Sequence, residues 1–246
     1  MTQLLTVRDL SYSFPQKKEV LKAISFSIKR GEFTLLCGRN GSGKSLLLKC
    51  LKGLLTVKTG AIVINGVDLT HKAKERNRLI GLVFQDAETQ MVGQTVKKDL
   101  SFGLENLKID PLQQEAIIKE VSDLLNLKSY LNERPRRLSG GEQRRLAIGG
   151  VLVMSPAIIL LDEPFANLDW DGIKQVLTSL NNLKSKGATI VVATHEIEKV
   201  IALADSMILL DQGTVVREGS VSSVLQVVES YGVRAPLSSE VTAWSN

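Results

Sequence analysis

The stretch GRNGSGKS, from Gly38 to Ser45, decides the fold expected for this chain. It matches the pattern G-x-x-x-x-G-K-[ST], whose glycines let backbone amides wrap a phosphate group. The apolar run Phe33 to Cys37 precedes it, and the helix-forming run SLLLKCLKGLL includes its last residue and continues the chain. A strand, a glycine loop and a helix in this order form a phosphate-binding loop, or P-loop. The stretch therefore predicts a nucleotide-binding α/β core.

Each residue type in this loop has a separate task toward the phosphates of ATP. Lys44 can reach the β- and γ-phosphate oxygens, and the Ser45 hydroxyl can bind Mg²⁺. The backbone amides around them can wrap the β-phosphate. The sequence thus predicts an ATP-binding set of Gly38, Asn40, Gly41, Ser42, Gly43, Lys44, Ser45 and Leu46.

Two later apolar runs end in polar residues that suit phosphate chemistry. In AIILLDEP, Asp162 follows the buried strand and can hold the Mg²⁺ hydration shell, while Glu163 can accept a proton from the attacking water. In VVATHE, His195 ends another apolar strand, at the edge of the sheet where a γ-phosphate would lie. We therefore expect Glu163 and His195 to be catalytic, and Asp162 to be a metal ligand beside Ser45.

Short apolar runs alternate with helical ones along most of the chain, which predicts a mostly parallel sheet covered by helices. Between Phe84 and Ala157 the alternation stops, and we expect helices over Val96–Asn106, Pro111–Leu125 and Glu142–Met154. We interpret this segment as a helical subdomain inserted into the core. The expected strands are LLTVRDL, AISFSI, FTLLC, AIVIN, LIGLVF, AIILLD, TIVVAT and SMILLD.

Composition limits the class of protein further. The 246 residues are 43% hydrophobic, and 31 basic against 26 acidic residues leave a net charge of only +5, without a basic stripe that would suit a nucleic-acid partner. We expect Cys37 and Cys50 to be buried thiols in a reducing compartment. The N-terminus lacks a signal-peptide layout, and no apolar stretch approaches the roughly 20 residues that span a bilayer. The sequence therefore indicates a soluble, cytoplasmic chain.

A second stretch rich in small residues, LSGGEQ at Leu138 to Gln143, precedes another helical run, and backbone amides at a helix start favour phosphate oxygens. With this signature the chain resembles the nucleotide-binding subunits of ATP-binding-cassette (ABC) proteins, from SYSFP near its start to DQGTVVREGS near its end. The resemblance implies a homodimer or heterodimer with a second ABC ATPase, in which each ATP lies between the glycine loop of one subunit and the signature of the other. The signature and interface residues that it implies are Ser139, Gly140, Gly141, Glu142 and Asp169.

The resemblance also assigns roles to single residues. Phe14 matches the aromatic residue that stacks on adenine, with Tyr12 as the alternative. Gln85 matches a glutamine that senses Mg²⁺ and the attacking water, so it is expected to be both catalytic and metal-binding. His195 matches the switch that contacts the γ-phosphate.

Three residues depart from the family pattern. Arg39 stands where proline is frequent. Leu46 replaces a hydroxyl residue, which removes a hydrogen bond to the α-phosphate worth about 1 kcal/mol. Trp170 replaces a frequent proline directly after Asp169, and the sequence does not explain what this changes.

The predicted architecture is an α/β P-loop NTPase core with a mostly parallel sheet, an N-terminal antiparallel β subdomain and an inserted α-helical signature subdomain. A single ABC ATPase domain is expected over residues 1–232, with its core at 1–85 and 157–232 and the helical subdomain at 86–156. Residues 233–246 are expected to form a loosely attached tail.

The segment FQDAETQMVGQTVKKDLSFGLEN resembles the energy-coupling-factor importers, which move vitamins, cobalt and nickel. This implies an ATPase that uses ATP and Mg²⁺ at the cytoplasmic face of the membrane and powers import through transmembrane subunits. The alternative is a soluble ABC ATPase acting on nucleic acid or the ribosome, which would usually carry two cassettes or a long heptad insertion. A small-molecule kinase would account for the glycine loop but not for LSGGEQ, Gln85 and His195 together.

The loop Asp86 to Gln94 contains two apolar residues, Met91 and Val92. We expect them to be exposed, within a groove that receives a short helix of a membrane partner. The alternative is that they pack beneath their own helices. Because Gln85 precedes this loop, a nucleotide-driven shift there would rotate the helical subdomain as a body.

Overall fold

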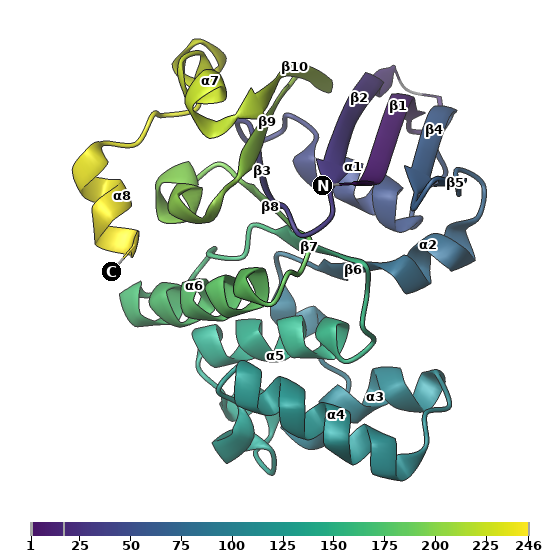
Figure 1. Ribbon diagram of the computed structural model, residues 1–246, viewed down its shortest axis with the longest axis vertical. Coiled ribbons are helices and arrows are strands. Elements are labelled where there is room, and N and C mark those ends of the chain that lie inside the picture. Colours follow the sequence, from purple (N-terminus) through teal and green to yellow (C-terminus); the bar gives the residue numbers. More distant parts are fainter. Residues whose placement is uncertain (1, 17, 246) are drawn as a thin grey trace.

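The computed structural model describes residues 2–16 and 18–245, so residues 1, 17 and 246 of the predicted domain and tail lie outside the described residues. A six-stranded sheet lies in the middle of the molecule (Figure 1). One face packs against a four-stranded sheet and the helix α1 (Lys44–Lys52), and the other packs against a group of longer helices. This arrangement confirms the predicted α/β fold.

In the six-stranded sheet, the four strands that the predicted phosphate-binding and catalytic residues follow are neighbours: β3, β8, β7 and β6. Neighbouring strands from β9 to β6 run parallel, whereas β10 is antiparallel to β9. The strand β10 was not predicted, because its sequence TVVREGS is half polar and it forms an edge of the sheet. The strand order is β10 (Thr214–Ser220), β9 (Ser206–Asp211), β3 (Phe33–Cys37), β8 (Ile190–Thr194), β7 (Ile158–Asp162) and β6 (Ile80–Val83).

Strands β3, β7 and β8 are buried along their whole length, which accounts for their uninterrupted apolar sequences. Alternate residues serve opposite faces: Leu35 packs with the helices, and Leu36 packs with the smaller sheet. Cys37 and Cys50 are free and buried, as expected, and burial raises the pKa of both thiols to about 12.

The smaller sheet is antiparallel and confirms the predicted N-terminal β subdomain. Its last strand was not predicted, because it consists of two exposed residues after a tight turn. The strand order is β2 (Glu19–Lys29), β1 (Gln3–Ser13), β4 (Thr59–Ile64) and β5 (Val67–Asp68).

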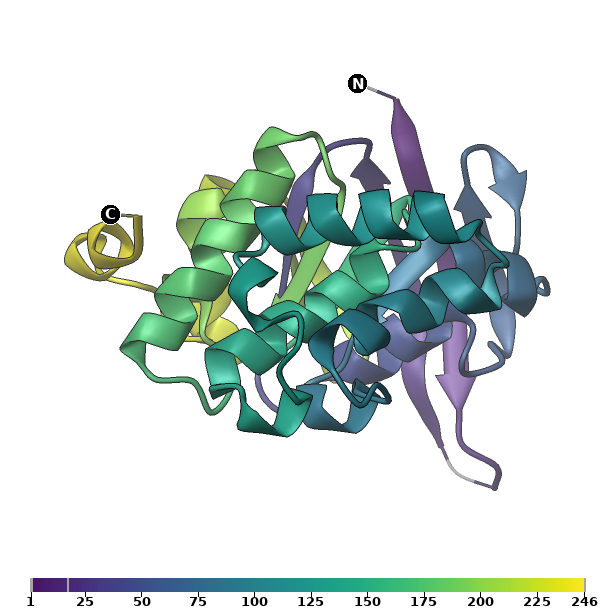
Figure 2. The ribbon, with the colours of Figure 1, turned by 90° about the horizontal axis from the view of Figure 1, so that it is seen from below.

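The inserted helices lie across the far face of the central sheet, as the view from below in Figure 2 shows. Ser139 caps the third of them, so that helix begins two residues before the predicted Glu142. The first begins and ends as predicted, because Thr95 caps it and accepts a hydrogen bond from the amide of Lys98. These helices are α3 (Val96–Asn106), α4 (Pro111–Leu124) and α5 (Gly140–Leu152), and α6 (Trp170–Ser185) packs beside them.

Short helices complete the described part of the chain. None of the helices described is long and apolar enough to cross a membrane. The remaining elements are α2 (Ala73–Leu79), α7 (Val221–Leu225), α8 (Ser238–Ser245), η1 (Ala87–Gln90), η2 (Lys128–Tyr130), η3 (Pro135–Arg137), η4 (Ile197–Lys199), η5 (Ile201–Leu203) and η6 (Val228–Tyr231).

The C-terminal segment packs on the core rather than hanging free, which corrects the expectation of a loosely attached tail. Val233 is buried, and Val241 and Trp244 pack against the helical side of the core. The helix α8 lies beside η4 and η5, at the end of the chain coloured yellow in Figure 1.

Candidate nucleotide site

Four parallel strands end at one edge of the central sheet, and the predicted chemistry follows each of them. The register pairs Cys37 with Thr194, Asp162 with Ala193, and Val83 with Leu161. The residues at the ends of these strands therefore lie side by side at this edge. They are the glycine loop, His195, the adjacent carboxylates Asp162 and Glu163, and Gln85. This is the edge at which parallel α/β sheets bind ligands.

The glycine loop turns back over the end of β3. Gly38 has a φ of 152°, and a Cβ there would lie 2.2 Å from the carbonyl oxygen of Leu210, so only glycine fits. Ser42 is buried, and its carbonyl accepts a hydrogen bond of 3.0 Å from the amide of Gly213. The departure Arg39 forms an ion pair of 3.1 Å with Asp211 at the end of β9. The loop is thus fastened to β9 and to the turn after it.

Lys44 points into the loop instead of toward solvent. Its Nζ donates to the carbonyl oxygen of Gly38 at 2.7 Å and lies 3.4 Å from Oε1 of Glu163. Both side chains are buried. A buried ammonium at the mouth of a ring of backbone amides is arranged to receive phosphate oxygens.

The Ser45 hydroxyl and the Asp162 carboxylate form a second polar pair. Ser45 Oγ donates to Asp162 Oδ1 at 2.9 Å. Burial raises the pKa of the Asp162 carboxyl; the hydrogen bond from Ser45 opposes the rise, and the charge of Glu163 adds to it. A cation between these oxygens would relieve the cost of the buried charge.

Glu163 combines an unusual backbone conformation with two contacts of its carboxylate. Its φ of 44° lies in the left-handed region that non-glycine residues seldom adopt. Thr194 Oγ1 donates to its Oε2 at 2.7 Å, and the Nδ1 of His195 lies 3.1 Å from its Oε1. Sequence reasoning missed Thr194, although it directly precedes His195 at the end of the same strand.

These residues surround an open cleft of about 490 Å³. The Phe14 ring is 41% exposed at its wall, whereas Tyr12 is only 7% exposed and belongs to the core, so Phe14 is the aromatic residue available to a ligand. Val20 and Ala166 also line the cleft and carry no sequence signal. The lining is Phe14, Val20, Asn40, Gly41, Gly43, Lys44, Ser45, Leu46, Gln85, Glu163, Ala166 and His195.

Among the described residues, none of the signature or interface set lines this cleft. Ser139 and Glu142 instead form a capping box at the start of α5: Glu142 Oε2 accepts the amide of Ser139 at 2.8 Å, and Ser139 Oγ accepts the amide of Glu142 at 3.4 Å. Asp169 caps α6 by accepting the amide of Gly172 at 2.8 Å.

The two signature glycines lie in different surroundings. A Cβ on Gly140 would lie 3.1 Å from the side chain of Leu168, whereas one on Gly141 would lie 2.7 Å from the Cα of Gly172. Gly141 therefore allows α5 and α6 to approach closely, a packing role that the sequence did not reveal.

The signature helix is tied to the Gln85 segment by a buried arginine. Arg144 Nη1 donates to the carbonyl oxygen of Phe84 at 2.8 Å, directly before Gln85. Burial lowers the pKa of Arg144, and the carboxylates of Asp86 and Asp162 act in the opposite direction. This hydrogen bond links the start of the Gln85 segment directly to α5.

Comparisons with known proteins agree with this geometry. Residues 21–166 match the family model described as ABC transporter. The chain is 39% identical to the cobalt import ATP-binding protein CbiO of Rhodobacter capsulatus, covering 96% of this chain and 87% of the relative. It is 36% identical to the energy-coupling factor transporter ATP-binding protein EcfA of Methanocaldococcus jannaschii, covering 92% of this chain and 82% of the relative.

Solved structures show the same fold. The structure of cbiO1 from Clostridium perfringens, part of the ABC transporter complex cbiONQ, superimposes with a TM-score of 0.85 at 31% identity, covering 96% of this chain and 97% of that one. A nucleotide-free ATP-binding cassette from an ABC transporter superimposes with a TM-score of 0.81 at 25% identity, covering 94% and 99% of the two chains. The chain therefore belongs to the ABC transporter family, as one of its ATP-binding, ATP-hydrolysing subunits.

Proposed function

We propose that this chain powers the import of a vitamin or a transition-metal ion through separate transmembrane subunits, from the cytoplasmic face of the membrane. The relatives that support this are named as cobalt import and energy-coupling factor subunits. They favour import over the alternative of a soluble ABC ATPase acting on nucleic acid or the ribosome. The observation that carries the ATP-driven part of the proposal is the cleft lined by Lys44, Ser45 and Glu163, with Asp162 hydrogen-bonded to Ser45 behind it.

In the proposed reaction, Glu163 accepts a proton from the water that attacks the γ-phosphate. Thr194 and His195 hold its two oxygens, which orients the carboxylate before ATP arrives. Lys44 exchanges its contacts with the loop for the β- and γ-phosphate oxygens. Phe14 stacks on the adenine at the mouth of the cleft.

Mg²⁺ fits the oxygens of Ser45 and Asp162, with Gln85 at the same cleft. Within the described parts of the chain, no cluster of three or more His, Cys, Asp or Glu side chains could hold a metal unaided. A site with few protein ligands suits Mg²⁺, which keeps waters and shares substrate phosphates. When bound, Mg²⁺ would neutralise charge on the phosphate oxygens.

We also propose that the signature serves the ATP of a second subunit. Ser139 Oγ accepts the amide of Glu142, and this bond leaves the proton of the hydroxyl to be donated to a phosphate across the interface. Asp169 would lie in the same interface. Residues 1–232 would then act as one domain, with its core at 1–85 and 157–232 and the helical subdomain at 86–156.

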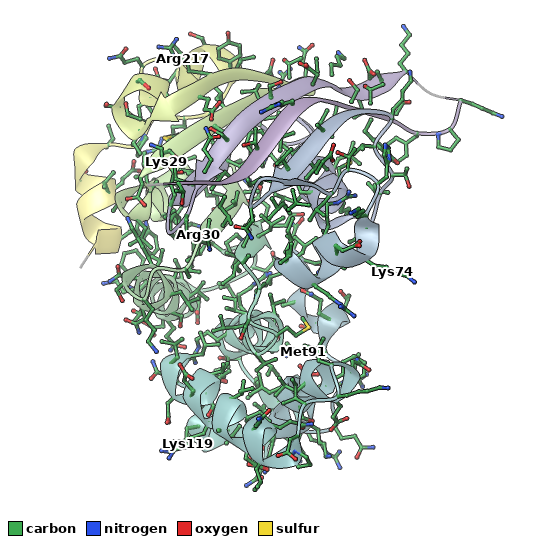
Figure 3. The ribbon with its side chains drawn as sticks, turned by 45° about the vertical axis from the view of Figure 1, so that its right-hand side comes forward. Lys29, Arg30, Lys74, Met91, Lys119 and Arg217 are labelled. Atoms are coloured by element: carbon green, nitrogen blue, oxygen red, sulfur yellow. The ribbon has the colours of Figure 1, made fainter. Side chains whose placement is uncertain are left out.

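A groove beside the Gln85 segment is the proposed docking site for a membrane subunit. It measures about 340 Å³ and lies between the end of β6, η1, α3 and α5. Val92 and Phe102 are 59% and 50% exposed in its lining. Met91, labelled in Figure 3 among the helices below the sheets, packs against the core instead. The expectation that both loop residues line a groove therefore holds for Val92 alone.

The substitution Glu163→Gln tests this function. It should slow hydrolysis by about 10²-fold or more while ATP still binds, because the amide cannot accept the proton of the water. ATP and Mg²⁺ should then hold two subunits together, and size-exclusion chromatography should show a dimer. A persistent monomer at high protein concentration would contradict the shared site.

The matched variant adds Ser139→Asp. Aspartate caps a helix about as well as serine, so α5 should keep its start, but its charge would repel the γ-phosphate of the partner's ATP. The double variant should bind ATP as a monomer and fail to dimerise. Gly141→Asp is a poorer test, because it would also force α5 and α6 apart.

A further inference from the structure

Trp170 and Trp244 are the only two tryptophans of the sequence, and they are in contact. Their ring centroids lie 4.1 Å apart with the planes inclined by 36°. Lys174, one turn along α6, places its Nζ 5.4 Å from the centre of the Trp170 ring. The C-terminal helix α8 is therefore attached to the first residue of α6, directly after Asp169.

Other contacts fix α8 at this place. Arg234 and Glu240 form an ion pair, and the amide of Leu237 donates to the second carboxylate oxygen of Glu240 at 2.9 Å. Val241, like Trp244, packs against the helical side of the core. The polar contacts lie within the segment that follows the buried Val233, and the apolar contact of Val241 joins that segment to the core.

The helix α8 contacts the segments that follow two predicted site residues. It packs against η4 and η5, which follow His195, and its Trp244 stacks on Trp170 of α6, which follows Asp169. A hollow of about 400 Å³ remains between α6, the segment η4–η5 and the ring of Trp244, so α8 is not packed continuously onto α6. Trp244 lines this hollow from α8 and is the described residue of α8 that stacks on α6.

We propose that Trp170 and Trp244 are positioning residues, through which α8 holds the Asp169 segment in the conformation that a second subunit meets when two subunits close on ATP. The proposal rests on the ATP-dependent dimer described above. Asp169 caps the first turn of α6, and Trp170 is the first residue of that turn. A restraint on the indole of Trp170 therefore also restrains the capping residue Asp169. Loss of the Trp244 ring would leave Trp170 and Asp169 free to move.

The experiment uses the full chain with Glu163→Gln, so that ATP and Mg²⁺ accumulate the dimer. Analytical ultracentrifugation measures its dissociation constant in four versions: Glu163→Gln alone, and with Trp244→Ala, Trp244→Phe or Leu237→Ala. We expect Trp244→Ala to weaken the dimer by roughly fivefold, the range of an aromatic pair, and Trp244→Phe to restore most of it. Leu237→Ala, an exposed position of the same segment, should change nothing.

Two readouts separate positioning from general loss of structure. The affinity of the monomer for ATP should be the same in all four versions, because no residue of α8 lines the nucleotide cleft within the described residues. The near-ultraviolet circular dichroism of the stacked indoles should disappear with Trp244→Ala or Trp170→Phe. The effects of these two changes on dimerisation should not add when combined, because each removes the same contact.

The other possible results contradict either the shared ATP site or the positioning role of the two tryptophans. If Glu163→Gln alone stays monomeric with ATP, the shared site fails, and the positioning role fails with it. If it dimerises and Trp244→Ala dimerises equally well, the positioning role alone is wrong. Tighter dimerisation of Trp244→Ala would mean that α8 obstructs the partner, which also overturns the proposal.

Discussion

At the scale of single residues, Asp162 carries a carboxylate whose charged form is disfavoured by burial. Its carboxylate is buried beside Glu163, and burial raises its pKa. A carboxyl whose pKa is higher in the folded chain than in the unfolded chain stabilises the fold at low pH, and this contribution is lost as the pH rises through the folded-state pKa. At neutral pH the nucleotide-free protein therefore carries an electrostatic cost at this residue.

Asp162→Asn should accordingly raise the Tm of the nucleotide-free protein at pH 7. The expected rise is a few degrees, since about 1 kcal/mol moves the Tm of a chain this long by roughly 2–4 °C. The gain should shrink as the pH is lowered, because the wild-type carboxyl then takes up a proton. Thermal unfolding at several pH values measures both effects.

The same variant should lose the additional stabilisation that Mg²⁺ gives beyond ATP alone. The control is Asp171→Asn, which removes a carboxylate from the exposed first turn of α6. A lower Tm for Asp162→Asn at pH 7 would contradict the assignment of an electrostatic cost to this carboxylate.

Two glycines of α5 allow a second test at this scale. A methyl group on Gly141 would lie 2.7 Å from the Cα of Gly172, whereas one on Gly150 would find its nearest neighbour 4.0 Å away. Gly141→Ala should therefore destabilise the protein by about 1–3 kcal/mol through overpacking. Gly150→Ala should stabilise it by up to about 1 kcal/mol, because alanine favours a helix interior. Urea unfolding of the two variants should show opposite signs; equal signs would mean that α5 and α6 separate easily.

At the scale of elements, α5 connects the sheet to the other helices through two adjacent arginines. Arg144 binds the carbonyl of Phe84 after β6, and Arg145 donates to the carbonyls of Leu125 and Asn126 after α4. Both side chains are buried, and burial lowers the pKa of both. The helix therefore couples one neighbour in the sheet to one in the helical group.

Replacing each arginine by methionine should separate these two connections. Both variants should lose about 1–3 kcal/mol, because buried carbonyls lose their donors. Arg144→Met should accelerate hydrogen exchange in residues 84–91, and Arg145→Met should do so in residues 124–131. If Arg144→Met leaves the exchange of residues 84–91 unchanged, the arginine does not hold the Gln85 segment.

At the scale of the whole molecule, the groove and the nucleotide cleft lie on either side of the Gln85 segment. Gln85 lines the cleft, whereas Phe84, the residue before it, lines the groove and accepts the hydrogen bond from Arg144. A membrane subunit bound in the groove would thus touch the segment that lines the nucleotide cleft. This proximity would couple transport to hydrolysis.

The double substitution Val92→Asp with Phe102→Asp tests this coupling. Both side chains are exposed, so basal hydrolysis by the isolated chain should stay within about twofold of wild type. Co-purification with a membrane subunit and uptake of its substrate should be lost, because two carboxylates would enter an apolar contact. Leu112→Asp, 82% exposed on α4 and outside the groove lining, is the control and should still assemble. Continued transport by the double variant would exclude the groove as the docking site.

The sequence by itself determined most of the elements and the chemistry that follows the buried strands, but it missed the edge strands β5 and β10, which are short or half polar. The glycine loop, the helix Val96–Asn106 and the acidic pair after β7 could be predicted because each depends on neighbours within a few residues: turn geometry, a capping side chain, an apolar run. Once the strands are parallel, their carboxyl ends share one edge, so the positions of Lys44, Glu163 and His195 near one another follow as well.

Only the tertiary structure decided which of several plausible side chains meets a ligand and which meets another part of the chain. Phe14 faces the cleft while Tyr12 is buried, Gly141 packs on Gly172, and Trp170 stacks on a residue 74 positions later, Trp244. These choices depend on the distance between elements far apart in the sequence. That distance is set by close packing of the whole core, where a single methyl group can be excluded, and no local pattern of residues encodes it.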